Sequence, residues 1–165
     1  GDAFGEHGYY EHPRHLHEEL TQVPLVVVVP DSAAARVETP VSTLDIVPTA
    51  LELVDSDAEL PGRSLLEIAR EQPADRVVFA QASGEDDESH LRRFGAWSTR
   101  ERAFGEYDAD IDSSRITEQS DGEIATRLAD HMNERIRAGD GGESRDGTDV
   151  DDEIEQRLTA LGYKE

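Results

Sequence analysis

A continuous apolar run, Leu-Val-Val-Val-Val, fills positions 25–29 of the chain. A short run of β-branched residues is typical of a strand that is buried on both faces, as in the centre of a parallel sheet. Just before it, residues 15–21 place Leu16 and Leu20 at helical spacing, and Pro24 separates the two segments. The pattern therefore predicts a helix over residues 15–21 and a central strand over residues 25–29.

Two more helices are predicted downstream, over residues 41–54 and 64–70. Pro48 is compatible with the first of them because it falls in the first turn, where its missing amide hydrogen would have no partner. The residues able to cap that turn are Ser42, Thr43 and Asp45. The apolar positions of this helix lie along one stripe, formed by Leu44, Val47, Leu51 and Val54.

Residues 76–81, 94–98 and 102–107 are short segments rich in valine and aromatic residues, separated by polar loops. They predict a small antiparallel sheet. A capping-box pattern from Ser120 to Glu123 then opens a helix. Its apolar residues recur every four positions, which predicts that this helix packs on the sheet: Ile124, Leu128, Met132 and Ile136.

The composition of the remaining residues divides the chain further. Residues 139–148, GDGGESRDGT, are rich in glycine and charge and predict a flexible linker, and residues 150–161 predict a last helix. We expect four parts: a first α/β part, a sheet-and-helix subdomain, the linker and the C-terminal helix. Their boundaries are 1–72, 73–138, 139–148 and 149–165.

The chain of 165 residues carries a formal net charge of -22. Phosphates would be repelled by this charge, so nucleic acids and anionic membranes are excluded as expected partners. Acidic residues occur along the whole length and Lys164 is the only lysine, a bias typical of a salt-in halophile. The apolar runs are shorter than the roughly 20 residues of a membrane helix. The absence of cysteine rules out disulfides and zinc-thiolate sites.

Candidate chemistry is concentrated at the N-terminal end. Four of the six histidines are found there, His7, His12, His15 and His17, interleaved with glutamates. Imidazole and carboxylate groups at this density could bind a metal ion or an anion. The metal interpretation is disfavoured, because Pro13 prevents one continuous helix from presenting the four imidazoles together.

A series of motifs in this part of the chain follows a familiar order. GDAFGEHG is followed by the histidine-bearing loop, then by EEL, VPLVVVVP, PVSTLDIVPTALEL and PGRSLL. This order, over residues 1 to about 66, resembles the C-terminal part of a type I sulfatase of the alkaline phosphatase superfamily, with a haloarchaeal composition. The resemblance implies an α/β fold: part of a catalytic domain built on a mainly parallel sheet, followed by a small α+β subdomain with an antiparallel sheet and a helix.

The resemblance also implies which site residues this chain holds. The formylglycine nucleophile and the calcium ligands of the family are expected upstream of Gly1, so no metal ligand is expected here. Asp2 would be a carboxylate close to the metal without coordinating it. His12 would be the catalytic and substrate-binding residue, a cation in contact with the sulfate oxygens, and His7 would lie at the rim of the pocket.

Two neighbours of His12 compete for the same role. The loop sequence EHPRHLH departs from the family pattern, so Arg14 or His15 would contact the anion if the register differs by one or two residues. In each case a cation would hold the ester and stabilise charge that develops on the leaving oxygen.

The expected function is therefore that of a fragment of a sulfatase-like hydrolase, inactive alone, whose full-length form hydrolyses small anionic sulfate esters with calcium and formylglycine. One alternative is a phosphodiesterase or phosphoglycerol-transferase relative, and another is a non-enzymatic acidic module. We expect a cytoplasmic location in a high-salt cell, with secretion left open because the natural N-terminus is expected to precede Gly1.

Overall fold

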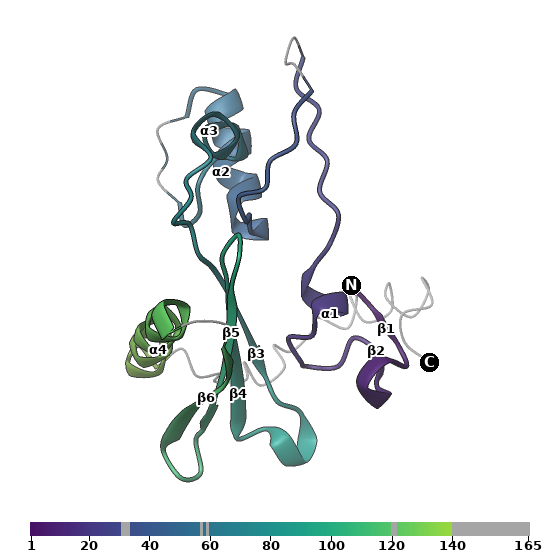
Figure 1. Cartoon of the computed structure of the whole chain (residues 1–165), viewed down its shortest axis with the longest axis vertical. Helices are drawn as coiled ribbons and strands as arrows, with labels where there is room; N and C mark the ends of the chain where they lie inside the picture. Colours follow the sequence, from purple (N-terminus) through teal and green to yellow (C-terminus); the bar gives the residue numbers. More distant parts are fainter. Residues whose placement is uncertain (31–33, 57, 59, 120–121, 140–165) are drawn as a thin grey trace, which may run out of the picture. The chain divides into compact units, whose positions relative to one another are not determined.

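A computed structural model describes residues 1–30, 34–56, 58, 60–119 and 122–139 (Figure 1). The chain divides into two compact units, Gly1–Glu134 and Arg135–Glu165. Of the second unit, only residues 135–139 are described.

The capping residue Ser120, most of the linker over 139–148 and the whole helix over 150–161 lie outside the described residues.

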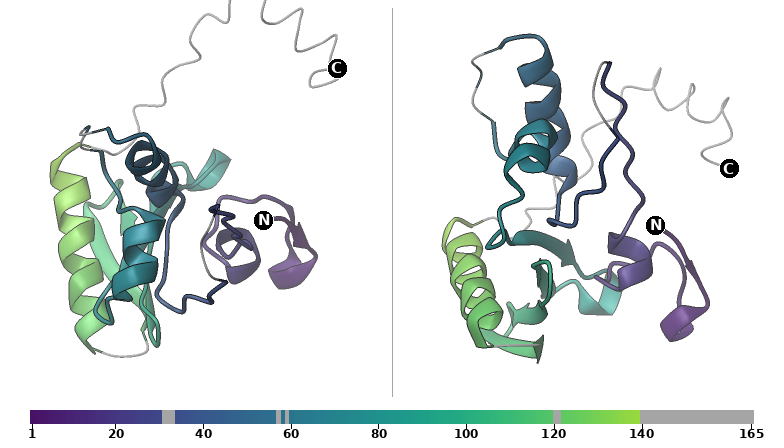
Figure 2. Two further views of the ribbon diagram at one scale, coloured as in Figure 1. Left: turned by 90° about the horizontal axis from the view of Figure 1, so that it is seen from above. Right: turned by 45° about the horizontal axis from the view of Figure 1, so that its top comes forward.

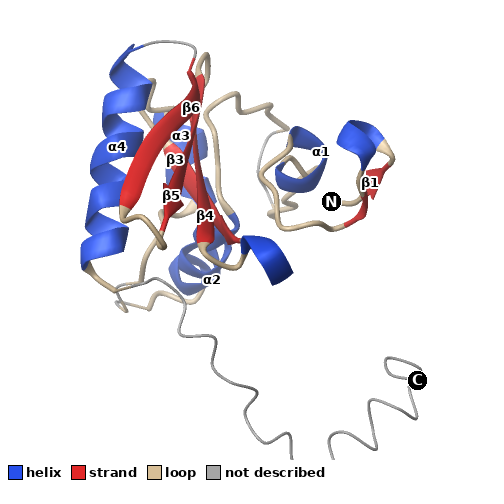
Figure 3. Cartoon of the chain, turned by 90° about the horizontal axis from the view of Figure 1, so that it is seen from below, coloured by secondary structure: helices blue, strands red, loops and turns tan. Residues whose placement is uncertain are grey.

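The main sheet is a four-stranded antiparallel meander in the order β3-β4-β5-β6 (Figure 3). Its strands are β3 Val78–Ser83, β4 Leu91–Trp97, β5 Arg102–Asp108 and β6 Ser113–Gln119. The first three overlap the predicted strands. The fourth was not predicted, because β6 has the sequence SSRITEQ, in which Ile116 is the only apolar residue. As an edge strand it pairs only with β5, so its side chains need little apolar character.

Helix α4, Gly122–Arg137, covers one face of this sheet, as its apolar spacing predicts (Figure 2). Ile124, Leu128 and Met132 are buried on the helix. The fit against the strand below is close, because a Cβ on Gly105 of β5 would lie 2.6 Å from the Met132 sulfur. Most of the buried apolar side chains of the first unit lie on this helix and the sheet.

The segment before the sheet contains the two short helices predicted there. A 3-10 turn, η2 Thr43–Asp45, leads directly into α2 Ile46–Leu53, and α3 Leu65–Glu71 follows. The capping prediction is confirmed, since Ser42 and Asp45 form a capping box on the turn. Most of the apolar stripe on α2 is nevertheless exposed, at Leu44, Val47 and Val54.

The predicted central strand over residues 25–29 is wrong for this chain. These residues form neither strand nor helix, and Val26 and Val28 are 85% and 89% exposed. A strand buried on both faces needs neighbouring strands and covering helices, and the described residues place none around this run. The mainly parallel sheet expected from the family is therefore absent from the described part of the chain, in which every strand pair is antiparallel.

The predicted helix over residues 15–21 is also shorter than expected, because α1 spans only Glu18–Thr21. Among the described residues, the α/β character of the chain comes from helices and antiparallel strands. None of the described helices has the length and apolar content needed to cross a membrane.

The exposed valines predict self-association of the isolated chain, because an extended apolar segment offers unpaired backbone groups to a second molecule. We expect Val28→Lys to lower the weight-average mass of the chain in sedimentation experiments and to leave its melting temperature unchanged. Ile111→Lys is the matched control, since Ile111 is 71% exposed but stands alone in a turn. An equal effect of both substitutions would mean that charge, and not residues 25–29, controls association.

Candidate functional site

The N-terminal residues form a small hairpin. Strand β1, Ala3–Phe4, pairs antiparallel with β2, Tyr10–Glu11. The connecting FGEHG sequence makes the 3-10 turn η1, Glu6–Gly8. Gly5 and Gly8 have φ values of 110° and 81°, a left-handed backbone that glycine adopts without steric cost.

Glu6 holds this turn together. Its carboxylate accepts a hydrogen bond from the backbone N–H of Phe4 at 2.5 Å. This bond lowers the pKa of Glu6 below its ordinary value, because it favours the ionised form. The turn carries His7 at its tip, with a φ of 55°.

The hairpin register brings His12 to Asp2. Because Ala3 lies opposite Glu11, the residues just beyond this pair, Asp2 and His12, also face each other. The His12 Nδ1 atom lies 3.1 Å from an Asp2 carboxylate oxygen, and both side chains are mostly exposed. This contact orients the imidazole and directs its second nitrogen, Nε2, away from the carboxylate.

Arg14 is engaged elsewhere. Its guanidinium forms an ion pair with Glu85, in the loop between β3 and β4. Its carbonyl oxygen accepts a hydrogen bond from Arg93 of β4 at 3.1 Å. An anion bound by Arg14 would have to compete with the Glu85 carboxylate.

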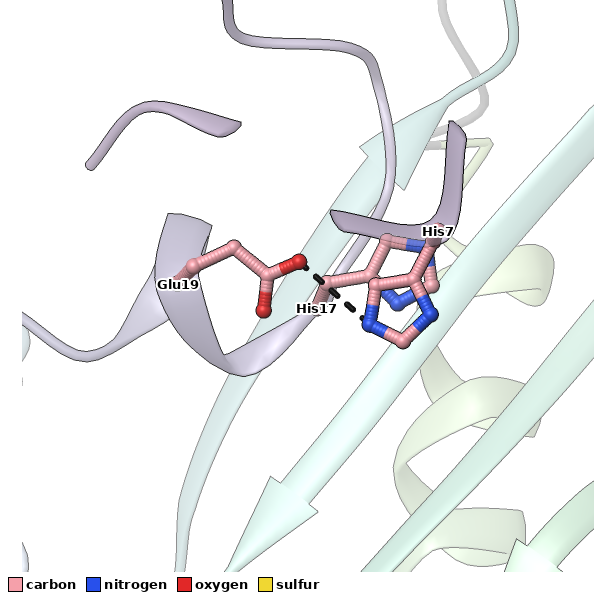
Figure 4. A group of neighbouring side chains, drawn as sticks. All are labelled: His7, His17 and Glu19. Carbon is pink, nitrogen blue, oxygen red and sulfur yellow. Dashed lines mark ion pairs between the residues drawn. The ribbon is translucent and has the colours of Figure 1, made fainter. Parts of the chain in front are cut away.

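The other three histidines of this region gather into a stack. The ring centroids of His7 and His17 are 4.0 Å apart, and the two ring planes make an angle of 8°. The His15 ring centroid lies 5.1 Å from that of His17. Glu19 adds a carboxylate, with 3.4 Å between its Oε1 and the His7 Nε2 atom (Figure 4). The helix predicted over residues 15–21 would include His15 and His17. In the structure both precede α1, and His17 is its N-terminal cap residue.

This stack lines a cavity of about 500 Å³ between the N-terminal segment and strands β4, β5 and β6. The cavity walls carry Arg93 and Arg102 as cations. Burial, aided by the charge of Arg93, lowers the pKa of His15, and burial, aided by the charge of His7, lowers the pKa of His17. Both shifts favour the neutral form of the imidazole.

Of the four histidines considered from the sequence, the structure brings His7, His15 and His17 together and places His12 on Asp2. Sequence reasoning missed Glu19, whose position in an EEL sequence had a plain helical explanation. Pro13 rules out one continuous helix through the four histidines. A hairpin turn and the start of α1 bring three of them together without such a helix.

A second group with ligand atoms close together is formed by His90, Asp108 and Asp110. The Asp108 carboxylate accepts a hydrogen bond from the Asp110 backbone N–H at 3.0 Å. This bond is a turn interaction, and it accounts for the position of Asp108 without a bound ion.

A calcium ion does not fit the donors present. Calcium takes six to eight oxygen ligands, whereas two of the three close donors at His7, His17 and Glu19 are nitrogens. Asp2, which the family resemblance places near the metal, directs one oxygen to His12. His7, His17 and Glu19 therefore do not provide the oxygen cage that calcium needs.

Comparison with known proteins gives a partial relationship. No protein-family model matches the chain, and no solved structure matches it. The uncharacterized sulfatase YidJ of Escherichia coli (strain K12) is 30% identical over 70 residues, which are 41% of this chain and 14% of that protein. The chain thus covers only a small part of the length of this relative, and what it shares with it is a sulfatase-like segment.

Proposed function

We propose that this chain is part of a sulfatase-like hydrolase and that His12 is its contact to the sulfate group of a small anionic ester. The main support for the proposal is the contact between His12 Nδ1 and an Asp2 carboxylate oxygen, 3.1 Å apart. These two residues lie next to the Ala3–Glu11 pair of the hairpin. The sequence similarity to a sulfatase supports the reaction class.

The geometry favours His12 over the other three candidates for this role. Arg14 is paired with Glu85, and His7 is paired with Glu19 and stacked on His17. Burial lowers the pKa of His15, which disfavours the charged form that would attract an anion.

Two properties of His12 suit it to the reaction. When Nδ1–H donates to the Asp2 carboxylate, the ring is held in one orientation and, if protonated, can donate from Nε2 to an ester oxygen. A donor placed at the developing negative charge of the leaving oxygen stabilises the transition state more than the ground state. His12 would then bind and polarise the ester.

The remaining machinery is proposed to lie in other parts of a longer protein. By the family resemblance, these parts hold the formylglycine nucleophile and the calcium ligands, and this chain alone is inactive. The setting we propose is the cytoplasm of a halophilic archaeal cell, supported by the net charge of -22.

In the longer protein, we expect His12→Ala to lower kcat/KM for an aryl sulfate by about 100-fold, the usual scale for losing one donor to developing charge. Steady-state kinetics with a chromogenic aryl sulfate measures this effect. The matched control is His90→Ala, which removes a histidine from the start of the β4 hairpin and should leave the rate unchanged.

The same enzyme should be assayed with an aryl phosphate monoester and a diester. A preference for the diester would favour the phosphodiesterase or phosphoglycerol-transferase alternative over the sulfatase. If the His12 and His90 variants lose activity equally, His12 is not the contact to the sulfate group.

A further inference from the structure

One carboxylate oxygen next to the stacked histidines is buried without a hydrogen-bond partner in the described part of the chain. The Oε1 atom of Glu19 is buried and has no hydrogen-bond donor among the described residues. The His7 Nε2 atom lies 3.4 Å from it, beyond the length of an ordinary hydrogen bond. A buried carboxylate oxygen without a hydrogen bond is costly, and an ion is one of the partners that resolve such a cost.

Three ligating atoms converge at this point. One nitrogen of His7, one of His17 and one carboxylate oxygen of Glu19 lie within 4.8 Å of one another (Figure 4). In a tetrahedral zinc site with bonds of roughly 2.0–2.1 Å, ligand atoms are about 3.3 Å apart. Binding would require the His7 ring, now stacked on that of His17, to rotate, and its side chain is 54% exposed.

The backbone supporting two of the ligands is already fixed. The His17 carbonyl accepts hydrogen bonds from the Leu20 and Thr21 N–H groups at 3.0 and 3.1 Å and from the Thr21 hydroxyl at 3.0 Å. These hydrogen bonds fix the backbone positions of His17 and Glu19 at the start of α1. The conformational entropy lost on metal binding would then come mainly from ordering the His7 side chain.

We propose that His7, His17 and Glu19 form a binding site for a borderline transition-metal dication, with zinc as the probe. Two imidazole nitrogens and one carboxylate oxygen are a ligand set of zinc sites with three protein ligands, in which water takes the fourth position. The two nitrogens select zinc, nickel or copper over calcium and magnesium. The site shares no residue with the Asp2–His12 contact, so it stands independently of the proposed sulfatase function.

The charges around the site are compatible with a dication. Arg93 lines the same cavity, and its charge acts on His15 and His17. It is paired with Glu88 at 2.7 Å and lies 3.9 Å from Glu106, which offsets its repulsion of a metal ion. Glu18 and Glu118 add further carboxylates to the same cavity.

The test is titration of the full 165-residue chain with zinc by isothermal calorimetry at pH 7.5 in a non-chelating buffer. We expect one zinc ion per chain. His17→Ala and Glu19→Gln should each weaken binding by at least about 10-fold. His90→Ala, which disrupts the second candidate group, and His12→Ala should leave the zinc affinity unchanged.

A second measurement needs no substitution. On addition of zinc, the ring nitrogen resonances of His7 and His17 should shift in the NMR spectrum, while those of His12 stay in place. Cobalt should give the visible absorption bands of a tetrahedral site.

Several outcomes would overturn the proposal: no zinc binding, binding as strong in the His17 and Glu19 variants as in the wild type, or loss of binding only in His90→Ala. Calcium binding as tight as zinc binding would contradict it as well, since the donor set disfavours calcium. If the longer protein keeps sulfatase activity but does not bind zinc, the proposed function stands and the metal site does not. If it binds zinc but lacks sulfatase activity, the metal site stands and the proposed function does not.

Discussion

Arg76→Leu is expected to lower the free energy of unfolding of this chain by about 3–5 kcal/mol, the usual cost of removing one partner of a buried ion pair. The Asp45 side chain is fully buried. The Arg76 Nη2 atom lies 2.8 and 2.7 Å from its two carboxylate oxygens. Without the guanidinium, a buried charge would remain uncompensated. Equilibrium unfolding in urea measures the loss.

The network around this pair explains why the effect should be large. The Asp45 carboxylate also accepts hydrogen bonds from the backbone N–H groups of Ser42 and Arg63, at 2.7 and 2.8 Å. Arg76 in turn donates from Nε to the Pro40 carbonyl at 3.0 Å. One ion pair thus ties the start of α2, the turn before α3 and the segment leading to β3 together.

The control for this prediction is Arg70→Leu, which removes an exposed ion pair with Glu52 at 2.8 Å. Exposed pairs contribute at most about 1 kcal/mol, because water and salt screen them. If the two leucine variants unfold at the same urea concentration, the Asp45–Arg76 pair does not hold these segments together.

Asp45 also shows where sequence reasoning stops. Its role as a helix cap follows from local pattern, because the capping box spans only residues 42–45. Its pairing with Arg76, 31 positions further along the chain, has no local signal. The sequence therefore predicted the element and missed the contact that fixes it to its neighbours.

The strands and helices show the same difference between features with a local sequence pattern and features that depend on distant residues. Helix α4 and strands β3 to β5 were predicted because their apolar spacing reflects the faces that they bury. The strand over residues 25–29 was wrong because burial on both faces depends on other elements, which the described residues do not place there. Strand β6 was missed because an edge strand needs few apolar side chains.

For the site, the sequence singled out the N-terminal region but not its internal geometry. The cross-strand contact of His12 with Asp2 depends on the two-residue strands of the hairpin, which are too short to show a period. The approach of His7 to Glu19 depends on a left-handed turn at residues 5–8. Such turns are permitted by glycine but do not by themselves specify which side chains will meet.

Leu128→Ala is expected to lower the free energy of unfolding by about 3 kcal/mol, within the usual range for deleting a buried leucine side chain. Leu128 is 0% exposed, and three of the five largest fully buried side chains of the described residues belong to α4, namely Ile124, Leu128 and Met132. Alanine has the higher helix propensity, so the loss would come from packing and not from the helix itself. Thermal and urea unfolding measure it.

The matched control is Leu53→Ala, the same substitution at a helical position that is 56% exposed. It should change stability by no more than about 0.5 kcal/mol, as is usual for surface positions. A chain with 36% hydrophobic residues has few apolar contacts to spare, so its core must depend on this helix and the sheet below it. If Leu128→Ala and Leu53→Ala proved equally mild, α4 would not be packed on the sheet, and the strands that wall the histidine cavity would lack their main support.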